Sequence, residues 1–425
     1  MAGTPNIFKN LTSDLPSGLV VFLVALPLCL GISLASGAPL LAGVVAGVVG
    51  GLVVSMLSGS QLSVSGPAAG LTVIVLNGIT KLGSFEVFLL SVAIAGVLQL
   101  LLGFFKAGII GHYFPSSVIK GMLAAIGLIL ILKQIPHFLG ADKDFFGEMA
   151  FWQNDGENTF SEVGYAFRHI EVGALIIGFV SLLVILFWDN VLLKRVAALK
   201  FFPSALVAVL LAIGINYLLG VYYPAWLVGT SHLVQLPEMN SLDKLSGQLR
   251  FPDFTALGNP DVYILAITIA IIASLETLLS VEAVDRMDPL KRVTPTNREL
   301  KAQGVGNFIS GMLGGLPMTA VIVRSSANIN AGGKTKLSAF FHGLLLLVSV
   351  LFLSSFLNQI PLSALAAVLL VVGYKLTKPY LYVNQYKLGW DQFIHFIVTV
   401  LDILFTDLLV GISIGLAIGV FFILK

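Results

Sequence analysis

The sequence predicts an all-α membrane protein in which fourteen transmembrane segments form two inverted repeats of seven. The chain of 425 residues is 57% hydrophobic and 11% charged, and its mean hydropathy of +0.97 is far above that of a soluble domain. Apolar stretches of about 20 residues, long enough to cross ~30 Å of hydrocarbon, recur along the chain. Two segments are interrupted by polar residues, and each is the third in its half of the chain. Broken helices at corresponding positions are typical of inverted-repeat transporters.

The first seven segments precede a polar connection at residues 221–260. Pro27 interrupts the first segment, and Ser65 and Pro67 break the third before a short helix that begins near Ala68. The predicted segments are 15–36, 39–57, 59–79, 85–105, 116–139, 172–188 and 203–219.

The second seven segments follow that connection, and the third of them is again broken. An odd number of segments per repeat gives the two halves opposite orientations, so the two broken segments are expected to aim their N-termini at one another. The predicted segments are 263–283, 302–313, 316–333, 337–357, 362–372, 393–405 and 408–424. The predicted divisions are an N-terminal segment 1–14, a first repeat 15–220, an extracellular connection 221–260 and a second repeat 261–425.

The distribution of basic residues predicts the orientation. With the N-terminus placed inside, sixteen lysines and arginines fall in inner loops or at inner ends and six in outer ones. This is a strong positive-inside bias. We therefore expect a multi-pass protein of the plasma membrane with both termini cytoplasmic and with the acidic loop 141–170 outside.

The stretch 316–333 carries Arg324 inside an apolar segment. A charge at membrane depth costs between ~2.5 and more than ~10 kcal/mol, so Arg324 marks a functional site. Pro317 and the β-branched residues that follow favour an extended strand, and a half-helix is expected to begin at Arg324. Its free N–H groups and positive dipole end, together with the guanidinium, would bind a small anion. The alternative is that Arg324 snorkels or pairs with a structural carboxylate.

Glu276 and Ser280 lie four residues apart in the eighth segment and therefore face one side of a helix. A buried carboxylate at that depth can hold a proton or help to ligate sodium. The two residues are the predicted coupling site and the candidate sodium ligands. The alternative is that Glu276 is a structural partner of Arg324 or of nearby backbone.

Other classes of function find little support. Cys29 is the only cysteine, so no intrachain disulfide can form, and no Cys/His zinc pattern is present. No nucleophile, base and orienting group converge, which argues against an enzyme. The basic residues are spread over inner loops as topology requires, so nucleic-acid binding is not expected. No cofactor is predicted apart from the possible sodium ion.

Several motifs resemble the sulfate permease (SulP) family of anion transporters. They are DLPSGL and ALPLCLGISLASG in the first segment, SGPAAG in the third, SLETLLSVEAVDR in the eighth, VGNFISGMLGGLP before the tenth, and VRSSANINAGGKT within it. The resemblance implies seven-plus-seven inverted repeats like those of uracil permeases. It also implies a mobile core of segments one to four and eight to eleven, and a gate made of the others.

The resemblance also implies the site residues. The anion would lie between the N-termini of the third and tenth segments, near the first. The implied anion-binding residues are Ala68, Ala69, Gly70, Val323, Arg324, Ser325, Leu28 and Ile32. Many members have Pro-Gln where this chain has Pro27-Leu28, which removes a donor and makes sulfate less expected. An Asp and a Thr contribute to a sodium site in similar bicarbonate transporters, at the positions of Glu276 and Ser280.

The sequence therefore predicts secondary active uptake of bicarbonate, coupled to sodium or protons by alternating access. The first-segment motif resembles cyanobacterial bicarbonate transporters, and SLETLLSVEAVDR resembles bacterial members found with carbonic anhydrases. A chloride or sulfate exchanger and a channel-like anion-binding protein are the alternatives. The resemblance implies a homodimer in the lipid bilayer. Most members continue into a cytoplasmic STAS domain, which this chain is expected to lack.

Overall fold

The structure is a computed structural model of the chain. The described residues are 10–113, 115–141, 151, 157–196, 199, 202–236, 249–406, 410–415 and 417–418. About half of the predicted segment 408–424 therefore lies outside the described residues, as do both termini and about half of the predicted loop 141–170.

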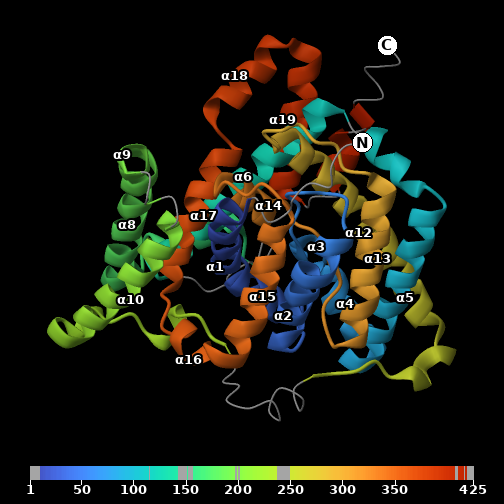
Figure 1. The fold of residues 1–425 in the computed structure, drawn as a ribbon, viewed down its shortest axis with the longest axis horizontal. Coiled ribbons are helices and arrows are strands. Elements are labelled where there is room, and N and C mark those ends of the chain that lie inside the picture. The colour runs from blue at the N-terminus through green and yellow to red at the C-terminus, as the bar shows by residue number, and fades with distance from the viewer. Residues whose placement is uncertain are drawn as a thin grey trace. The chain divides into compact units, whose positions relative to one another are not determined.

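Helices dominate the described structure (Figure 1). The longer ones are α1 Leu11–Ala35, α2 Leu40–Val49, α4 Thr72–Leu82, α5 Phe85–Phe104, α6 Ser116–Leu139, α8 Val172–Phe187, α10 Ser204–Tyr222, α12 Pro260–Met287, α13 Thr296–Met312, α15 Leu337–Phe352, α17 Leu362–Leu376 and α19 Trp390–Phe405. The shorter ones are α3 Ser55–Leu57, α7 Thr159–Ala166, α9 Leu193–Arg195, α14 Ile322–Asn330, α16 Ser354–Leu357 and α18 Pro379–Lys387. Two short strands pair, β1 Ser65–Pro67 and β2 Met318–Ala320.

Hydropathy located these helices well. Within the described residues, eight stretches are helical, long and apolar enough to cross a membrane. They are Leu11–Ala35, Leu40–Leu57, Phe85–Phe104, Ser116–Leu139, Val172–Arg195, Ser204–Tyr222, Pro260–Met287 and Leu362–Lys387. Two shorter apolar helices, Ala69–Leu82 and Leu337–Phe352, accompany them. The protein is thus a helical membrane protein, and the full set of fourteen segments stays a prediction.

Several predicted boundaries were wrong. Pro27 does not interrupt the first helix, because α1 runs through it. Only one intrahelical hydrogen bond is lost there, and neighbouring helices can accommodate that loss inside a membrane protein. A π-helical turn, Gly50–Val54, lies within the second segment. The eleventh segment ends at Phe352, where a separate short helix, α16, follows.

The chain divides into two compact units. Unit 1 comprises residues 1–108, 186–207 and 236–355, and unit 2 comprises 109–185, 208–235 and 356–425. Helices α1 to α5 and α12 to α15 belong to unit 1, together with both strands. Helices α6, α7 and α17 to α19 belong to unit 2.

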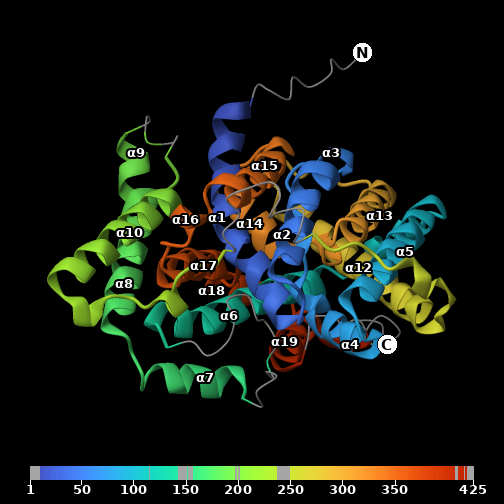
Figure 2. The same ribbon diagram turned by 90° about the horizontal axis from the view of Figure 1, so that it is seen from below.

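Small residues allow the helices of unit 1 to pack closely. Helices α5 and α13 lie side by side (Figure 1). A Cβ added to Gly304 of α13 would lie 2.6 Å from the Leu100 nitrogen and 2.7 Å from the Gly96 oxygen, so the two backbones are nearly in contact. Helix α1 packs against α2, α14 and α15 (Figure 2). Close approach through glycines is the usual packing mode of membrane helices.

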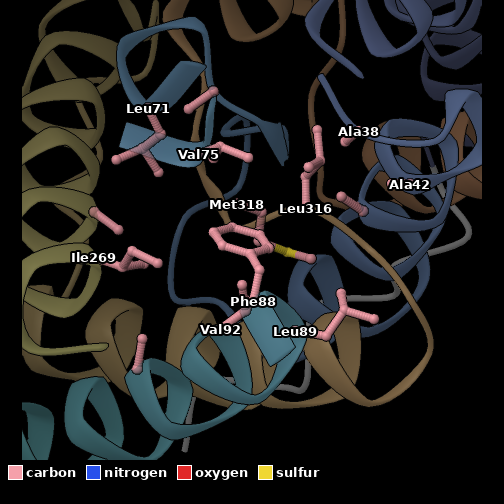
Figure 3. Packing of buried hydrophobic residues seen from close by; sticks show 14 of the residues in the cluster. Ala38, Ala42, Leu71, Val75, Phe88, Leu89, Val92, Ile269, Leu316 and Met318 are labelled. Atoms are coloured by element: carbon pink, nitrogen blue, oxygen red, sulfur yellow. The ribbon is translucent and has the colours of Figure 1, made fainter. Parts of the chain in front are cut away.

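An apolar cluster fills unit 1 behind the strands. Met318 of β2 points toward Phe88 of α5, with Leu71, Val75 and Ile269 nearby (Figure 3). Each of these side chains is buried. The cluster therefore joins β2 to α4, α5 and α12, and it fixes the start of α4 against the strand.

One end of unit 1 is tied by buried polar contacts. The Asp14 carboxylate in α1 accepts hydrogen bonds from the Lys334 and Thr335 backbone N–H groups at 2.7 and 3.0 Å and from the Thr335 hydroxyl. Ser17 Oγ donates to the Ala331 carbonyl at 2.9 Å. The first turns of α1 therefore hold the chain that leaves α14.

Unit 2 is organised around α6, which contacts α17 and α19. A Cβ on Gly127 of α6 would lie 2.7 Å from the Gly373 oxygen of α17, so these backbones also approach closely. Lys133 of α6 and Glu162 of α7 form a buried ion pair at 3.5 Å. Removing one partner of such a pair typically costs ~3–5 kcal/mol.

Candidate functional site

The two broken segments meet in an antiparallel ribbon. Ser65 pairs with Ala320, Gly66 with Thr319, and Pro67 with Met318. Because the strands run in opposite directions, α4 and α14 leave from opposite ends of the ribbon with their N-termini toward it. Three strand residues span about 7 Å, so the two helix starts are separated by only a few residues' length.

The first turn of α14 is held to the chain before β1. The Val321 N–H donates to the Val64 carbonyl at 2.9 Å, and Ser325 Oγ accepts from the Val64 N–H at 2.9 Å. Asn328 Nδ2 donates to the Leu62 carbonyl at 3.0 Å. These contacts fix the direction of α14 relative to the ribbon.

Helix α13 holds the ribbon with two side-chain amides. Asn307 Oδ1 accepts from the Met318 N–H at 2.7 Å, and its Nδ2 donates to the Met318 carbonyl at 3.0 Å. Gln303 Nε2 donates to Ser65 Oγ at 2.6 Å. In α12, Thr277 Oγ1 accepts from the Ala320 N–H at 3.3 Å. The ribbon is therefore positioned by side chains of two helices, α12 and α13.

Both helix starts offer free backbone donors. A 3-10 turn, Ala69–Leu71, follows Ala68 and leads into α4, so the regular helix begins at Thr72 rather than near Ala68. The Leu71 and Thr72 N–H groups donate to the Ala68 and Ala69 carbonyls, so the N–H groups without an acceptor in the turn are those of Ala69 and Gly70. The first N–H groups of α14 likewise have no intrahelical acceptor, and each helix end carries about half a positive charge. Two such ends beside one ribbon form a region of positive potential that suits a small anion.

Arg324 lies in the first turn of α14 but does not begin it. The helix starts at Ile322, so the prediction that it starts at Arg324 was wrong by two residues. The β-branched Ile322 and Val323 were expected to be extended, but both are helical, and the turn that follows them is held by hydrogen bonds of Ser325 and Asn328 with Val64 and Leu62. The Arg324 side chain is fully buried, and its Nε, Nη1 and Nη2 have no hydrogen-bond partner among the described residues.

The guanidinium lies against β1 and α2. A Cβ built on Gly66 would overlap Arg324 Nη1, and one built on Gly47 would lie 4.0 Å from it and 2.9 Å from Cys29 Sγ. A larger residue at position 66 would therefore force the guanidinium to move. The positive charge is therefore placed directly beside the ribbon.

Glu276 of α12 lies beside the turn that leads into α4. A Cβ on Gly70 would lie 3.2 Å from both carboxylate oxygens of Glu276, and Oε2 has no hydrogen-bond partner among the described residues. No ion pair within 4.0 Å joins Glu276 and Arg324 in the described part of the chain. Ser280, one turn further along α12, is also buried.

Two of the predicted anion-binding residues lie in α1. Leu28 and Ile32 are both buried and lie one turn apart. Ile32 belongs to the apolar cluster that contains Ala68 and Leu71. Of the predicted anion-binding residues, Ala68 to Gly70 and Val323 to Ser325 are thus brought to the two ends of one ribbon, with Ile32 beside Ala68.

Sequence reasoning missed the residues that position the site. Asn307 was noticed only as part of a motif, and Gln303 and Thr277 were not singled out. A buried amide in a membrane segment was the available signal, because such groups usually bond across helices. His342 lies inside α15 and is fully buried.

Comparisons with known proteins agree with this architecture. The model of the sulfate permease family matches residues 11–399. The Bacillus subtilis protein YvdB, which carries the name of a sulfate transporter, is 29% identical over 419 residues, 98% of this chain and 74% of its own length. The bicarbonate transporter BicA of Synechocystis is 28% identical over 372 residues, 86% of this chain and 61% of that protein.

Solved structures share the fold. The transmembrane domain of a cyanobacterial bicarbonate transporter BicA superposes with a TM-score of 0.63 at 24% identity, covering 97% of this chain and 98% of that one. SLC26A9 gives 0.68 at 17% identity, covering 98% of this chain and 66% of that one. The chain therefore belongs to the sulfate permease family and is an inorganic anion transporter rather than an enzyme.

Proposed function

We propose that the protein takes up bicarbonate by alternating access, coupled to sodium ions or protons. The observation that carries the proposal is the antiparallel pairing of β1 with β2, which brings two helix N-termini and one buried guanidinium to the same six residues. A monovalent anion there would accept hydrogen bonds from backbone N–H groups of Ala69, Gly70 and the first turn of α14. Arg324 would add a positive charge beside the ribbon.

Apolar residues near the helix ends favour a monovalent anion. Leu28 and Ile32 of α1 offer no hydrogen-bond donor, so a sulfate dianion would lose more hydration there than bicarbonate and regain less. The relatives' names favour a second candidate, because YvdB is named as a sulfate transporter. A sulfate or chloride exchanger is therefore the competing function, and a channel-like anion-binding protein is the third.

Glu276 would couple the anion to a cation. Its carboxylate lies beside Gly70, in the turn that leads into α4, and is not neutralised by Arg324. A sodium ion or a proton at Glu276, with Ser280 as a second oxygen, would balance the carboxylate's charge next to the anion. Loading of both ions would then precede movement of unit 1 as a core against unit 2 as a gate.

The distribution of basic residues supports the proposed orientation of the chain in the membrane. Their bias toward one set of loops is typical of an inner-membrane protein with both termini cytoplasmic. We expect a homodimer in the bilayer, by analogy with the family.

Uptake into proteoliposomes tests the proposal. Labelled bicarbonate and sulfate would be offered with sodium and proton gradients imposed separately, using wild type, Glu276→Gln and the control Glu282→Gln. Glu282 lies in the same helix and pairs with Arg286 at 2.9 Å. We expect gradient-driven bicarbonate accumulation that Glu276→Gln abolishes and Glu282→Gln retains. Sulfate uptake indifferent to both gradients and to Glu276→Gln would instead establish an exchanger, and flux that never exceeds equilibrium would indicate a channel.

A further inference from the structure

A stripe of buried polar side chains runs along one face of α13. Its members lie three or four residues apart, as neighbours on one helix face do, and each is 0% exposed. The stripe consists of Glu299, Gln303, Asn307 and Ser310. Asn307 and Ser310 bond the second broken segment, at Met318 and at the Leu316 carbonyl. The other half of the stripe bonds the first broken segment and the loop before it.

Glu299, in the first turn of α13, is the charged end of this stripe. Its carboxylate accepts hydrogen bonds from Ser58 Oγ and from Gln303 Nε2, the latter at 3.1 Å. The backbone N–H groups of Gly59 and Ser60 also donate to it. Four donors therefore converge on two oxygens, which fills the acceptor capacity of a carboxylate.

The partners of this carboxylate are hydrogen-bond donors rather than a cation. In the described part of the chain, no ion pair within 4.0 Å includes Glu299. The basic residues Arg298 and Lys336 donate instead to the Leu57 and Met56 carbonyls, at 2.9 and 2.8 Å, where α3 ends. A buried carboxylate without an ion pair depends on its hydrogen bonds. Glu299 and the loop that follows α3 therefore hold each other in place.

This loop leads directly into β1. Ser58 Oγ accepts from the Ser60 N–H at 2.9 Å, and Ser60 Oγ accepts from the Ser63 N–H at 3.1 Å, so each serine fixes the next part of the loop. The next residue, Val64, donates its N–H to Ser325 of α14. The position of Ser58 is thus transmitted to both broken segments.

Gln303 extends the hold of Glu299 to the strand itself. Its Nε2 donates to Glu299 and also to Ser65 Oγ, the latter at 2.6 Å. Its Oε1 has no hydrogen-bond partner among the described residues. The carboxylate, rather than a bond to the amide oxygen, therefore determines which end of the amide faces Ser65.

We propose that Glu299 is a positioning residue for the anion site at the ribbon. Through the serine loop and Gln303 it fixes β1, and the free N–H groups of Ala69 and Gly70 follow that strand within three residues. Without the carboxylate these donors would shift and bind an anion less tightly, while the rest of the helix packing persists. The role rests on the proposed function, because it acts through the proposed anion site.

Transport kinetics in proteoliposomes test this role. Glu299→Gln keeps the size of the side chain, but an amide nitrogen cannot accept, so donors of the loop lose their acceptor. We expect a rise of about five- to tenfold in KM with kcat changed less than about twofold. Gln303→Met keeps Glu299 and the loop and loses the bond to Ser65, so KM should rise by a smaller factor. Glu282→Gln, which removes the same charge from an ion pair of α12, should change neither constant.

Hydrogen exchange of the same purified variants measures the loop without transport. The Ser60 and Ser63 amides should exchange faster in Glu299→Gln than in wild type, and as in wild type in Glu282→Gln. Unchanged KM in both Glu299→Gln and Gln303→Met would overturn the proposal, as would a lower kcat at unchanged KM, because Glu299 would then only stabilise the loop. Unchanged exchange in Glu299→Gln would overturn it as well.

The transported probes separate this proposal from the proposed function. Labelled bicarbonate, sulfate and chloride would each be offered, and KM would be compared for whichever anion the wild type carries. Uptake of sulfate or chloride without bicarbonate would refute bicarbonate as the substrate, and a higher KM in Glu299→Gln for that other anion would still support the positioning role.

Discussion

The side chain of Asn307 forms two hydrogen bonds with the backbone of a single residue, Met318, and so continues the ribbon as a third strand would. Oδ1 accepts from the Met318 N–H at 2.7 Å and Nδ2 donates to its carbonyl at 3.0 Å. Nδ2 also donates to Gln99 Oε1 at 2.6 Å. One buried amide thereby connects β2 to α5 and α13.

Replacing Asn307 by Leu should remove transport and destabilise unit 1. It leaves the Met318 N–H and carbonyl buried and unpaired, which costs about 1–3 kcal/mol for each group. Asn307→Asp keeps the acceptor for the N–H and loses the donors, so it should be intermediate in Tm. Thermal unfolding and anion uptake are the measurements. Asn330→Leu, at the exposed end of α14, is the control and should resemble wild type. Equal Tm for Asn307→Leu and wild type would contradict the assigned role.

Gly70→Ala should impair coupling more than stability. The new methyl group would lie 3.2 Å from both oxygens of Glu276, so the carboxylate must shift by a few tenths of an ångström. We expect lower gradient-driven uptake with a Tm close to wild type. Gly214→Ala is the matched control, because no atom lies within 4 Å of the added methyl. Unchanged gradient-driven uptake in Gly70→Ala would contradict a role for Glu276 in coupling.

Gly304→Ala should destabilise the pair α5 and α13. Its methyl group would lie 2.6 Å from the Leu100 nitrogen, which belongs to the backbone and cannot rotate away. Overpacking of this kind typically costs about 1–3 kcal/mol. The loss should appear as a lower Tm for Gly304→Ala than for Gly214→Ala, and similar values for the two variants would count against rigid contact between these helices.

Asp288, just beyond the end of α12, should give a pH-dependent contribution to stability. Burial raises its pKa, but hydrogen bonds from Arg292 and the Leu290 N–H outweigh burial and hold the pKa below its ordinary value of 3.8. A carboxyl group whose pKa is lowered by folding stabilises the fold above its unfolded-state pKa, and the contribution disappears as pH falls through the folded-state pKa. Asp288→Asn should therefore lower Tm at pH 7, and the difference from wild type should shrink below about pH 4. A difference that stays constant from pH 7 to pH 3 would contradict this assignment.

Much of the fold was predictable from hydropathy alone. The predicted segment 116–139 coincides with α6, because Pro115 and Gly140 mark its ends with ordinary start and stop signals. Pro27 misled the prediction of α1, since a proline weakens a helix locally but the surrounding apolar helices maintain it. The π-helical turn in the second segment had no sequence signal that we recognised.

The sequence indicated which residues belong to the candidate site, but it indicated less of how they are arranged in space. The stretch around Arg324 and the break at Ser65 and Pro67 were identified from polar residues in apolar surroundings. Their pairing into a ribbon depends on contacts between distant parts of the chain, which local patterns do not contain. The direction of the Arg324 side chain depends on the space left by Gly66 and Gly47, and nothing in the local sequence reveals that space.

The ribbon also constrains how the protein is made. Its two strands are about 250 residues apart in the chain, so at a translation rate of about 5–20 residues per second β1 waits on the order of 10–50 s for its partner. During that interval the polar backbone around Gly66 has no strand to pair with at membrane depth, where unpaired groups are costly. The first half of the chain should therefore be held in a provisional arrangement until β2 is inserted. Assembly of the proposed anion site would then be one of the last events of biogenesis.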